Sequence, residues 1–126
     1  MNIKNLSGIA VVNKGAAPNK LDEIEKHIKS VLPIDYRELM ISADGFSFEN
    51  GLVVYSTDEL IERNETFEVD KYAPGHLAIG DDSGGRCILL SLASGKLFLV
   101  DQGSMDPDDM ETLANLKDWL SRNCPI

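Results

Sequence analysis

The sequence predicts an α+β domain in which a mostly antiparallel sheet of about five strands packs against helices. Residues 77–101 read as three short strands joined by two glycine-containing turns. Residues 87–90 and 97–100 are apolar without interruption, which is typical of strands buried on both faces. Segments with helical spacing of apolar residues stand before and after this region. The expected element order is therefore ααββαβββα.

Two consecutive helices are expected near the start of the chain. Apolar residues recur at spacings of three and four between residues 21 and 31, which places them on one face of a helix that Asn19 could cap. Pro33 should end this helix, because the residue before a proline is pushed out of the helical region. Asp35 and Glu38 then form a capping-box pattern, which predicts that a second helix starts there.

A hairpin and a short third helix are expected next. The Asn-Gly pair at residues 50–51 stands between two strand-like runs, and tight hairpin turns favour this pair because both residues accept a positive φ. Ser56 or Thr57 can cap a helix over residues 58–63. Residues 64–76 are mixed and polar, so we expect a helical turn followed by a loop.

One long helix is expected to close the chain after the three central strands. Asp106 can cap this helix, and Pro107 suits the first helical position. Apolar residues then recur at helical spacing from Met110 to Leu120, and this face should lie on the sheet. The chain shows no linker, repeat or low-complexity tract, so we expect a single domain over residues 1–126.

The charge of the chain limits its partners. The formal net charge is −9, and residues 35–126 carry eighteen acidic residues against seven Lys and Arg. Nucleic acid is not expected as a partner, because phosphate binding needs a basic face. A basic protein is the expected partner, although acidity also serves solubility alone. No apolar run approaches the ~20 residues that cross a bilayer. There is also no signal-peptide pattern, so we expect no membrane partner and a cytoplasmic location.

The residues that usually carry catalysis are sparse. The chain has two histidines, His27 and His76, and two cysteines, Cys87 and Cys124. None of them stands in the spacing of a nucleophile motif, a zinc site or a redox pair. Cys87 lies in an apolar strand and reads as a small core residue. We therefore expect a protein that is not an enzyme and that has no catalytic residue, metal ion or cofactor.

Two stretches are candidate binding sites. The first is Gly80–Gly85, where glycines allow close approach of the backbone to a ligand and two carboxylates could hold a hard cation. The simpler interpretation is a hairpin turn. The second is residues 101–111, an acidic stretch without Lys or Arg, which serves helix capping and solubility or forms a docking patch for a basic partner. The predicted partner-binding residues are Asp81, Asp82, Asp106, Asp108, Asp109 and Glu111.

Several motifs, in this order and spacing, resemble the SUKH superfamily, whose domain is also described as Knr/Smi-like. They begin with Leu-Pro-x-Asp-Tyr at residues 32–36 and Leu-Met at 39–40. The Asp-Gly step at 44–45 follows, where the superfamily usually has Asn-Gly. The longest motif is Leu-x-Ile-Gly-Asp-Asp-x-Gly-Gly at 77–85, and the last strand pair ends with Val-Asp at 100–101.

The resemblance implies a SUKH domain with a core at about residues 15–122 and helices packed against a mostly antiparallel sheet. Bacterial members of the superfamily are commonly immunity proteins that neutralise polymorphic toxins, often nucleases, and fungal members are regulatory partner-binding modules. The expected function is therefore a non-enzymatic protein-binding domain of the toxin-immunity type, with a basic toxin domain as its partner. The alternatives are a small-ligand or cation-sensing regulatory domain and a scaffold module like the cell-wall-synthesis regulators.

Overall fold

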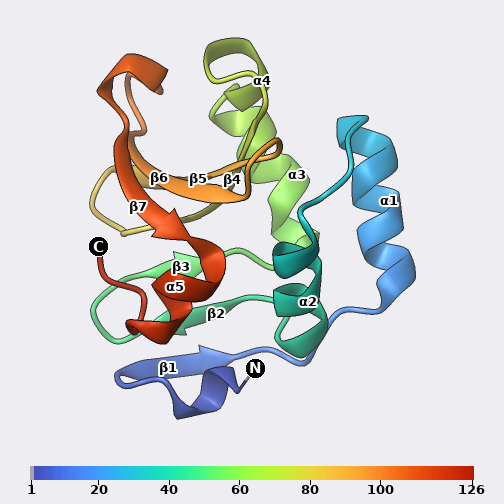
Figure 1. Ribbon diagram of the computed structural model, residues 1–126, viewed down its shortest axis with the longest axis vertical. Helices are drawn as coiled ribbons and strands as arrows, with labels where there is room; N and C mark the ends of the chain where they lie inside the picture. Colours follow the sequence, from blue (N-terminus) through green and yellow to red (C-terminus); the bar gives the residue numbers. More distant parts are fainter. Residues whose placement is uncertain (1) are drawn as a thin grey trace.

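The computed structural model describes residues 2–126, which form one seven-stranded antiparallel sheet with helices packed around it (Figure 1). The strands follow one another across the sheet in chain order. They are β1 (Ile9–Val12), β2 (Phe46–Phe48), β3 (Val53–Val54), β4 (His76–Asp81), β5 (Arg86–Ser91), β6 (Lys96–Asp101) and β7 (Glu111–Asn115). The helices are α1 (Pro18–Ile28), α2 (Ile34–Ser42), α3 (Thr57–Thr66), α4 (Val69–Tyr72) and α5 (Leu116–Ser121), with 3-10 helices η1 (Ile3–Asn5) and η2 (Pro107–Asp109).

The predicted α+β class and the antiparallel sheet are confirmed, but the strand number is seven rather than about five. The expected order lacked β1, α4 and β7. Within residues 2–126, no helix has both the length and the apolar composition of a membrane span.

The centre of the sheet is buried on both faces, as predicted. Successive side chains of a strand point to opposite faces, and Ile88 and Leu89 of β5 are both fully buried. The next strand is less symmetrical, because Phe98 of β6 is only half-buried. Helices α3 and α4 pack against β4, and α5 packs against β7. The domain therefore has one continuous core around β5.

The two N-terminal helices form where predicted, but neither start signal is used. Helix α1 begins at Pro18, before Asn19, and α2 begins at Ile34 with Pro33 in the capping position; neither has a side-chain cap. Helix α1 also ends early. Lys29 takes a left-handed conformation that closes the last turn, so Val31 lies beyond the helix and is 76% exposed.

The β2–β3 hairpin and the third helix are confirmed with changed bounds. Only Gly51 of the Asn-Gly pair has a positive φ, and four residues rather than two connect the strands. Ser56 lies at the N-cap of α3, where its backbone amide donates to the Glu59 carboxylate at 3.3 Å.

The single C-terminal helix predicted from Asp106 to Leu120 is wrong. The Asp106 carboxylate does accept a hydrogen bond from the Asp108 amide at 3.0 Å, but the helix lasts one turn. The chain then extends and pairs with β6, with Glu111 opposite Leu99. A new helix, α5, starts where the Asn115 side chain accepts a hydrogen bond from the Asp118 amide. Pairing with the sheet overrides the local helical spacing, and the acidic stretch becomes part of a sheet edge.

Replacing Ile88 with alanine tests the buried centre of the sheet. This change should lower the free energy of unfolding by about 2–5 kcal/mol, because it leaves a cavity in a packed core. The control is Ile34→Ala, at a side chain that is 71% exposed, which should change it by less than about 0.5 kcal/mol. Urea denaturation followed by the fluorescence of the buried Trp119 measures both, and equal unfolding midpoints would contradict the assignment.

Candidate functional site

The six predicted partner-binding residues lie at or near one end of the sheet. β4 ends at Asp81 and β6 at Asp101, whereas β5 begins at Arg86 and β7 at Glu111. Because neighbouring strands are antiparallel, these four positions reach the same end, and Arg86 is paired directly with Asp101. A main-chain hydrogen bond of 2.8 Å also joins the β4–β5 turn to the β6–β7 connection.

Asp82 holds its own turn together. Its carboxylate accepts hydrogen bonds from the amides of Gly84 (2.8 Å) and Arg86 (3.0 Å) and from the Arg86 side chain (2.9 Å). Desolvation alone would raise the pKa of the Asp82 carboxyl, but these hydrogen bonds outweigh it, and the pKa lies below the ordinary 3.8. Only 10% of the side chain is exposed. Most of the carboxylate is therefore used inside the protein rather than offered to a partner.

Asp81 is engaged in the same way. Its carboxylate accepts hydrogen bonds from the Tyr55 hydroxyl and from the Ser83 amide. Burial and the bond to Asp81 raise the pKa of Tyr55, so this phenol stays neutral at physiological pH. The Ser83 hydroxyl in turn donates to the Gly51 carbonyl oxygen at 2.6 Å. These contacts show the hairpin turn that was the simpler interpretation of Gly80–Gly85.

The backbone of the Gly80–Gly85 turn explains why two of its positions are glycine. A Cβ at Gly80 would lie 2.2 Å from the Val53 carbonyl oxygen, so only glycine lets β3 approach β4 there. Gly85 has a φ of +102°, a conformation that side-chain-bearing residues rarely adopt. Within residues 2–126, no group of three or more His, Cys, Asp or Glu side chains is arranged to hold a metal ion. The motif therefore shapes the sheet end.

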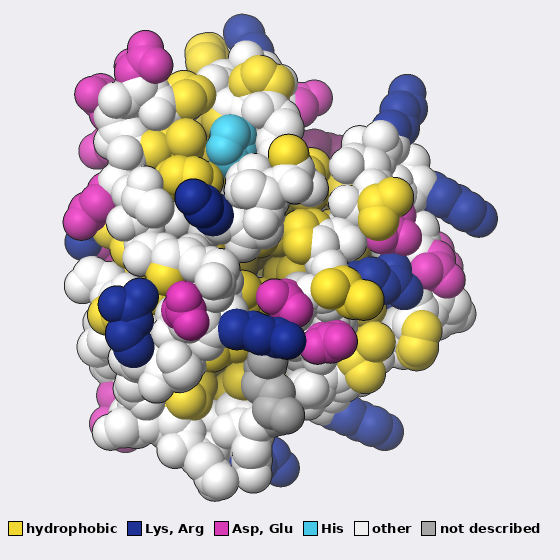
Figure 2. Space-filling model, viewed as in Figure 1, with side chains coloured by type: hydrophobic (Ala, Val, Ile, Leu, Met, Phe, Trp, Pro, Cys, Tyr) yellow, Lys and Arg dark blue, Asp and Glu magenta, His cyan; other side chains and the backbone are white. Residues whose placement is uncertain are grey.

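The other acidic residues form an exposed ridge. We define the acidic ridge as Asp101, Asp106, Asp108, Asp109 and Glu111, in the β6–β7 connection and at the ends of these strands. All are exposed except Asp106, which is half-buried. Among the described residues, no Lys, Arg or His forms an ion pair with any of them. Figure 2 shows acidic side chains along the edge of the molecule where Figure 1 places this connection. The ridge is therefore negative charge without a cation of its own.

Two carboxylates of the acidic ridge form hydrogen bonds with its own backbone. The Asp101 carboxylate accepts a hydrogen bond of 2.7 Å from the Gly103 amide, and the Asp106 carboxylate fixes the turn of η2. The remaining three carboxylates, those of Asp108, Asp109 and Glu111, accept no hydrogen bond within residues 2–126. Two ridge residues therefore shape the loop, and three are available to a partner.

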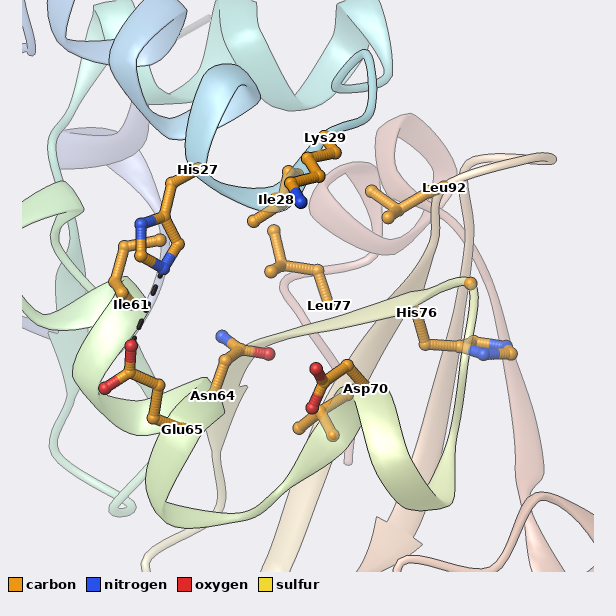
Figure 3. A pocket seen from close by; sticks show the side chains of 12 residues that line it. His27, Ile28, Lys29, Ile61, Asn64, Glu65, Asp70, His76, Leu77 and Leu92 are labelled. Atoms are coloured by element: carbon orange, nitrogen blue, oxygen red, sulfur yellow. Dashed lines mark ion pairs between the residues drawn. The ribbon is translucent and has the colours of Figure 1, made fainter.

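A cavity of about 370 Å³ lies at a different place, between the end of α1, helices α3 and α4, and the start of β4 (Figure 3). Both histidines line it, which the sequence did not indicate. The His27 ring lies 3.5 Å from the Glu65 carboxylate, across α1 and α3. The His76 ring points the other way and packs edge-on against Phe98, with 5.8 Å between ring centroids. The two histidines therefore do not converge on one point.

The thiols are also poorly placed for chemistry. Cys87 and Cys124 are buried and unpaired, and burial raises the pKa of each thiol to about 12. The nucleophilic form is the thiolate, which is scarce at physiological pH when the pKa is this high.

Exposed aliphatic side chains form another feature that the sequence missed. Val31 and Ile34 follow one another around the α1–α2 connection and are 76% and 71% exposed. The apolar spacing of residues 21–31 predicts Val31 on the apolar face of the first helix, and this prediction is wrong. Periodicity could not separate it from core residues, because the early end of α1 depends on the left-handed turn at Lys29.

Replacing Asp82 with asparagine tests whether this carboxylate is structural. The charged carboxylate accepts stronger hydrogen bonds than an amide, so the change should lower the free energy of unfolding by about 1–3 kcal/mol at pH 7. The folded-state pKa is depressed, so this difference is complete above the ordinary value of 3.8 and disappears as the pH falls below it. Asp108→Asn is the control and should be neutral within about 0.5 kcal/mol. Denaturation at several pH values measures both variants, and a pH-independent difference would count against the assignment.

Comparison with known proteins agrees with the motifs. The model of the SMI1 / KNR4 family (SUKH-1) matches residues 15–122. The chain is also 28% identical over 103 residues to the uncharacterized protein YnaB of Bacillus subtilis (strain 168), and the alignment covers 80% of this chain and 68% of that protein. The family match spans most of the chain and confirms the predicted resemblance. The chain therefore belongs to the SMI1 / KNR4 family (SUKH-1).

Proposed function

We propose that this chain is a non-enzymatic protein-binding domain whose acidic ridge contacts a basic surface of another protein. The observation that supports this proposal is the set of exposed carboxylates at one end of the sheet that have no internal cation. Elsewhere, the described residues form eight ion pairs, two of which involve Arg37. None of these pairs includes a ridge residue, so five carboxylates without an ion pair lie together at one end of the sheet.

Electrostatics gives the ridge a physical role in association. Several carboxylates close together on a surface produce a negative electrostatic potential. This potential attracts a basic partner and raises the association rate. The attraction extends over roughly a Debye length, about 8 Å at physiological salt, so added salt weakens it. Such charges mainly set the association rate and the choice of partner. A ridge of this kind favours a protein with clustered Lys and Arg.

The proposed partner is a toxin domain with a basic active surface, such as a nuclease. A nuclease must attract phosphates, so its substrate-binding surface is positively charged. An acidic ridge that covers this surface would block the substrate by charge and by bulk. The resemblance to immunity proteins supports this choice, and the sparse catalytic inventory is compatible with a protein that acts by binding alone.

A small-ligand sensor is the second candidate function, and it would use the cavity beside α1 rather than the Gly80–Gly85 turn. The turn is filled by the hydrogen bonds of Asp81 and Asp82, whereas the cavity has room for a small molecule. A ligand that binds only the folded state raises the melting temperature. A thermal-shift screen with metabolites and metal ions therefore separates this function from protein binding.

Reversing the charge of the ridge tests the proposed function. The variant Asp108→Lys/Asp109→Lys/Glu111→Lys should slow association with the proposed partner, a basic toxin domain, by about 10- to 100-fold. The matched control is Glu23→Lys/Glu38→Lys/Asp70→Lys, which changes the net charge equally at exposed acids outside the ridge. Surface plasmon resonance at about 50 and 300 mM salt measures both, and the difference between them should shrink at the higher salt.

Equal effects of the two triple variants would remove the ridge from the binding surface. Fast association of the ridge variant at low salt would do the same. Absence of binding by the wild-type protein would instead contradict the choice of partner.

A further inference from the structure

The outer side of β7 is an open strand edge. The sheet has two edge strands, β1 and β7. The short helix η1 contacts β1 (Figure 1), whereas among residues 2–126 no strand follows β7 in the sheet. Among the described residues, the main chain of residues 111–114 makes no hydrogen bond except with β6. The N–H and C=O groups on the other side of this strand are therefore free.

An open edge of this kind is normally protected, because it can pair with any other strand. β7 carries two of the usual protections. Its register with β6 shifts at Leu113, which adds a bulge, and Glu111 places a charge on the strand itself. The acidic ridge stands at the same end. Each copy of this chain also carries a formal net charge of −9, so pairing of two copies along β7 has to overcome their mutual repulsion.

The same charge favours a strand of opposite sign. We propose that β7 accepts an extended, lysine- or arginine-rich segment of the partner as an eighth strand of the sheet. This inference rests on the proposed function and states how the partner is held. The main-chain groups of residues 111–114 would supply hydrogen bonds, and the ridge carboxylates would select basic side chains at one end of the added strand.

The side chains of β7 suit a strand that is partly apolar as well as basic. Glu111 and Thr112 are exposed, whereas Leu113 and Ala114 are half-buried against the core and leave part of their surface open. An added strand presents side chains alternately to the two sides of the sheet. A segment that alternates lysine with valine therefore presents lysine on one face of the sheet and valine on the other. It has lysine at the ridge end of β7 whichever way it runs, and its valines can lie on the same face as Leu113.

The test uses a synthetic peptide as the probe. The peptide is capped, alternates lysine and valine over about eight residues, and is titrated into the ¹⁵N-labelled protein at low salt. We expect shifts of the amide signals of residues 111–114 and slower hydrogen exchange of those amides that face outward. Two further peptides are N-methylated, one at every valine and the other at every lysine.

The methylated peptides distinguish strand addition from charge attraction. A strand bonds to its neighbour through alternate residues, so one methylated peptide should lose at least about tenfold in affinity while the other stays within about twofold. A peptide with glutamate in place of lysine should not bind. Equal affinity of the two methylated peptides, or amide shifts confined to other parts of the protein, would overturn strand addition.

The outcome is separate from that of the charge-reversal experiment. Equal binding of both methylated peptides, combined with a strong effect of the ridge variant on the toxin domain, would refute the eighth strand and leave the ridge in place. Loss of affinity with only one methylated peptide would support the eighth strand. Combined with equal effects of the two triple variants, it would keep the eighth strand and remove the ridge from the binding surface. No binding of the lysine–valine peptide at millimolar concentration would also refute strand addition.

Discussion

The burial of both faces of β5 is the constraint on which the rest of the structure depends. Ile88 and Leu89 point to opposite faces of one strand, and neither has exposed surface. Other parts of the chain therefore cover both faces of the sheet at β5, and neither face is left there for a partner. The surfaces that remain are the helix exteriors, the loops at the ends of the strands and the outer edges of the sheet. The acidic ridge and the β7 edge are two of these surfaces, and they adjoin.

Similar carboxylates have different roles because their neighbours differ. Asp82 is followed by Gly84 and Arg86, whose amides and side chain all reach its carboxylate. Among the described residues, Asp108 and Asp109 form no ion pair and their carboxylates accept no hydrogen bond. The spacing of Asp82 and Arg86 could have identified the first pattern from the sequence alone. The pairing of Asp81 with Tyr55 could not, because 26 positions separate the two residues and only the fold brings them together.

The central strands could be predicted because their signal is local. Uninterrupted apolar runs between glycine-containing turns define β4, β5 and β6 without any knowledge of neighbours. The last part of the chain could not be predicted in this way. Apolar spacing from Met110 to Leu120 suits a helix, but β6 offers an unpaired edge, and residues 111–115 gain a ladder of hydrogen bonds by extending. Whether residues 111–115 form a helix or a strand is therefore decided by the neighbouring strand β6 rather than by their own apolar spacing.

The role of Asn64, on the other side of the central strands, could not be predicted from the local sequence either. β3 has two residues and pairs only with the end of β4, so Ala78 is paired with Leu89 of β5 on one side but has no strand partner on the other. The Asn64 side chain on α3 fills this place, because its amide donates to the Ala78 carbonyl oxygen at 2.9 Å and accepts from the Ala78 amide at 2.8 Å. A single side chain thus satisfies the main chain of Ala78 on the side that β3 does not reach.

The main chain of β4 and that of β7 are treated differently where a neighbouring strand is missing. Where β4 lacks a neighbouring strand, a helix supplies an amide side chain that satisfies the backbone. Where β7 lacks one, no described residue makes a hydrogen bond to its outer main chain, and a charge and a bulge protect the strand instead. The negative charge repels other copies of this acidic chain but attracts a basic chain. It therefore protects the β7 edge from self-association without excluding a basic partner. An edge defended in this way remains open to a partner of the opposite sign, which a covered edge does not.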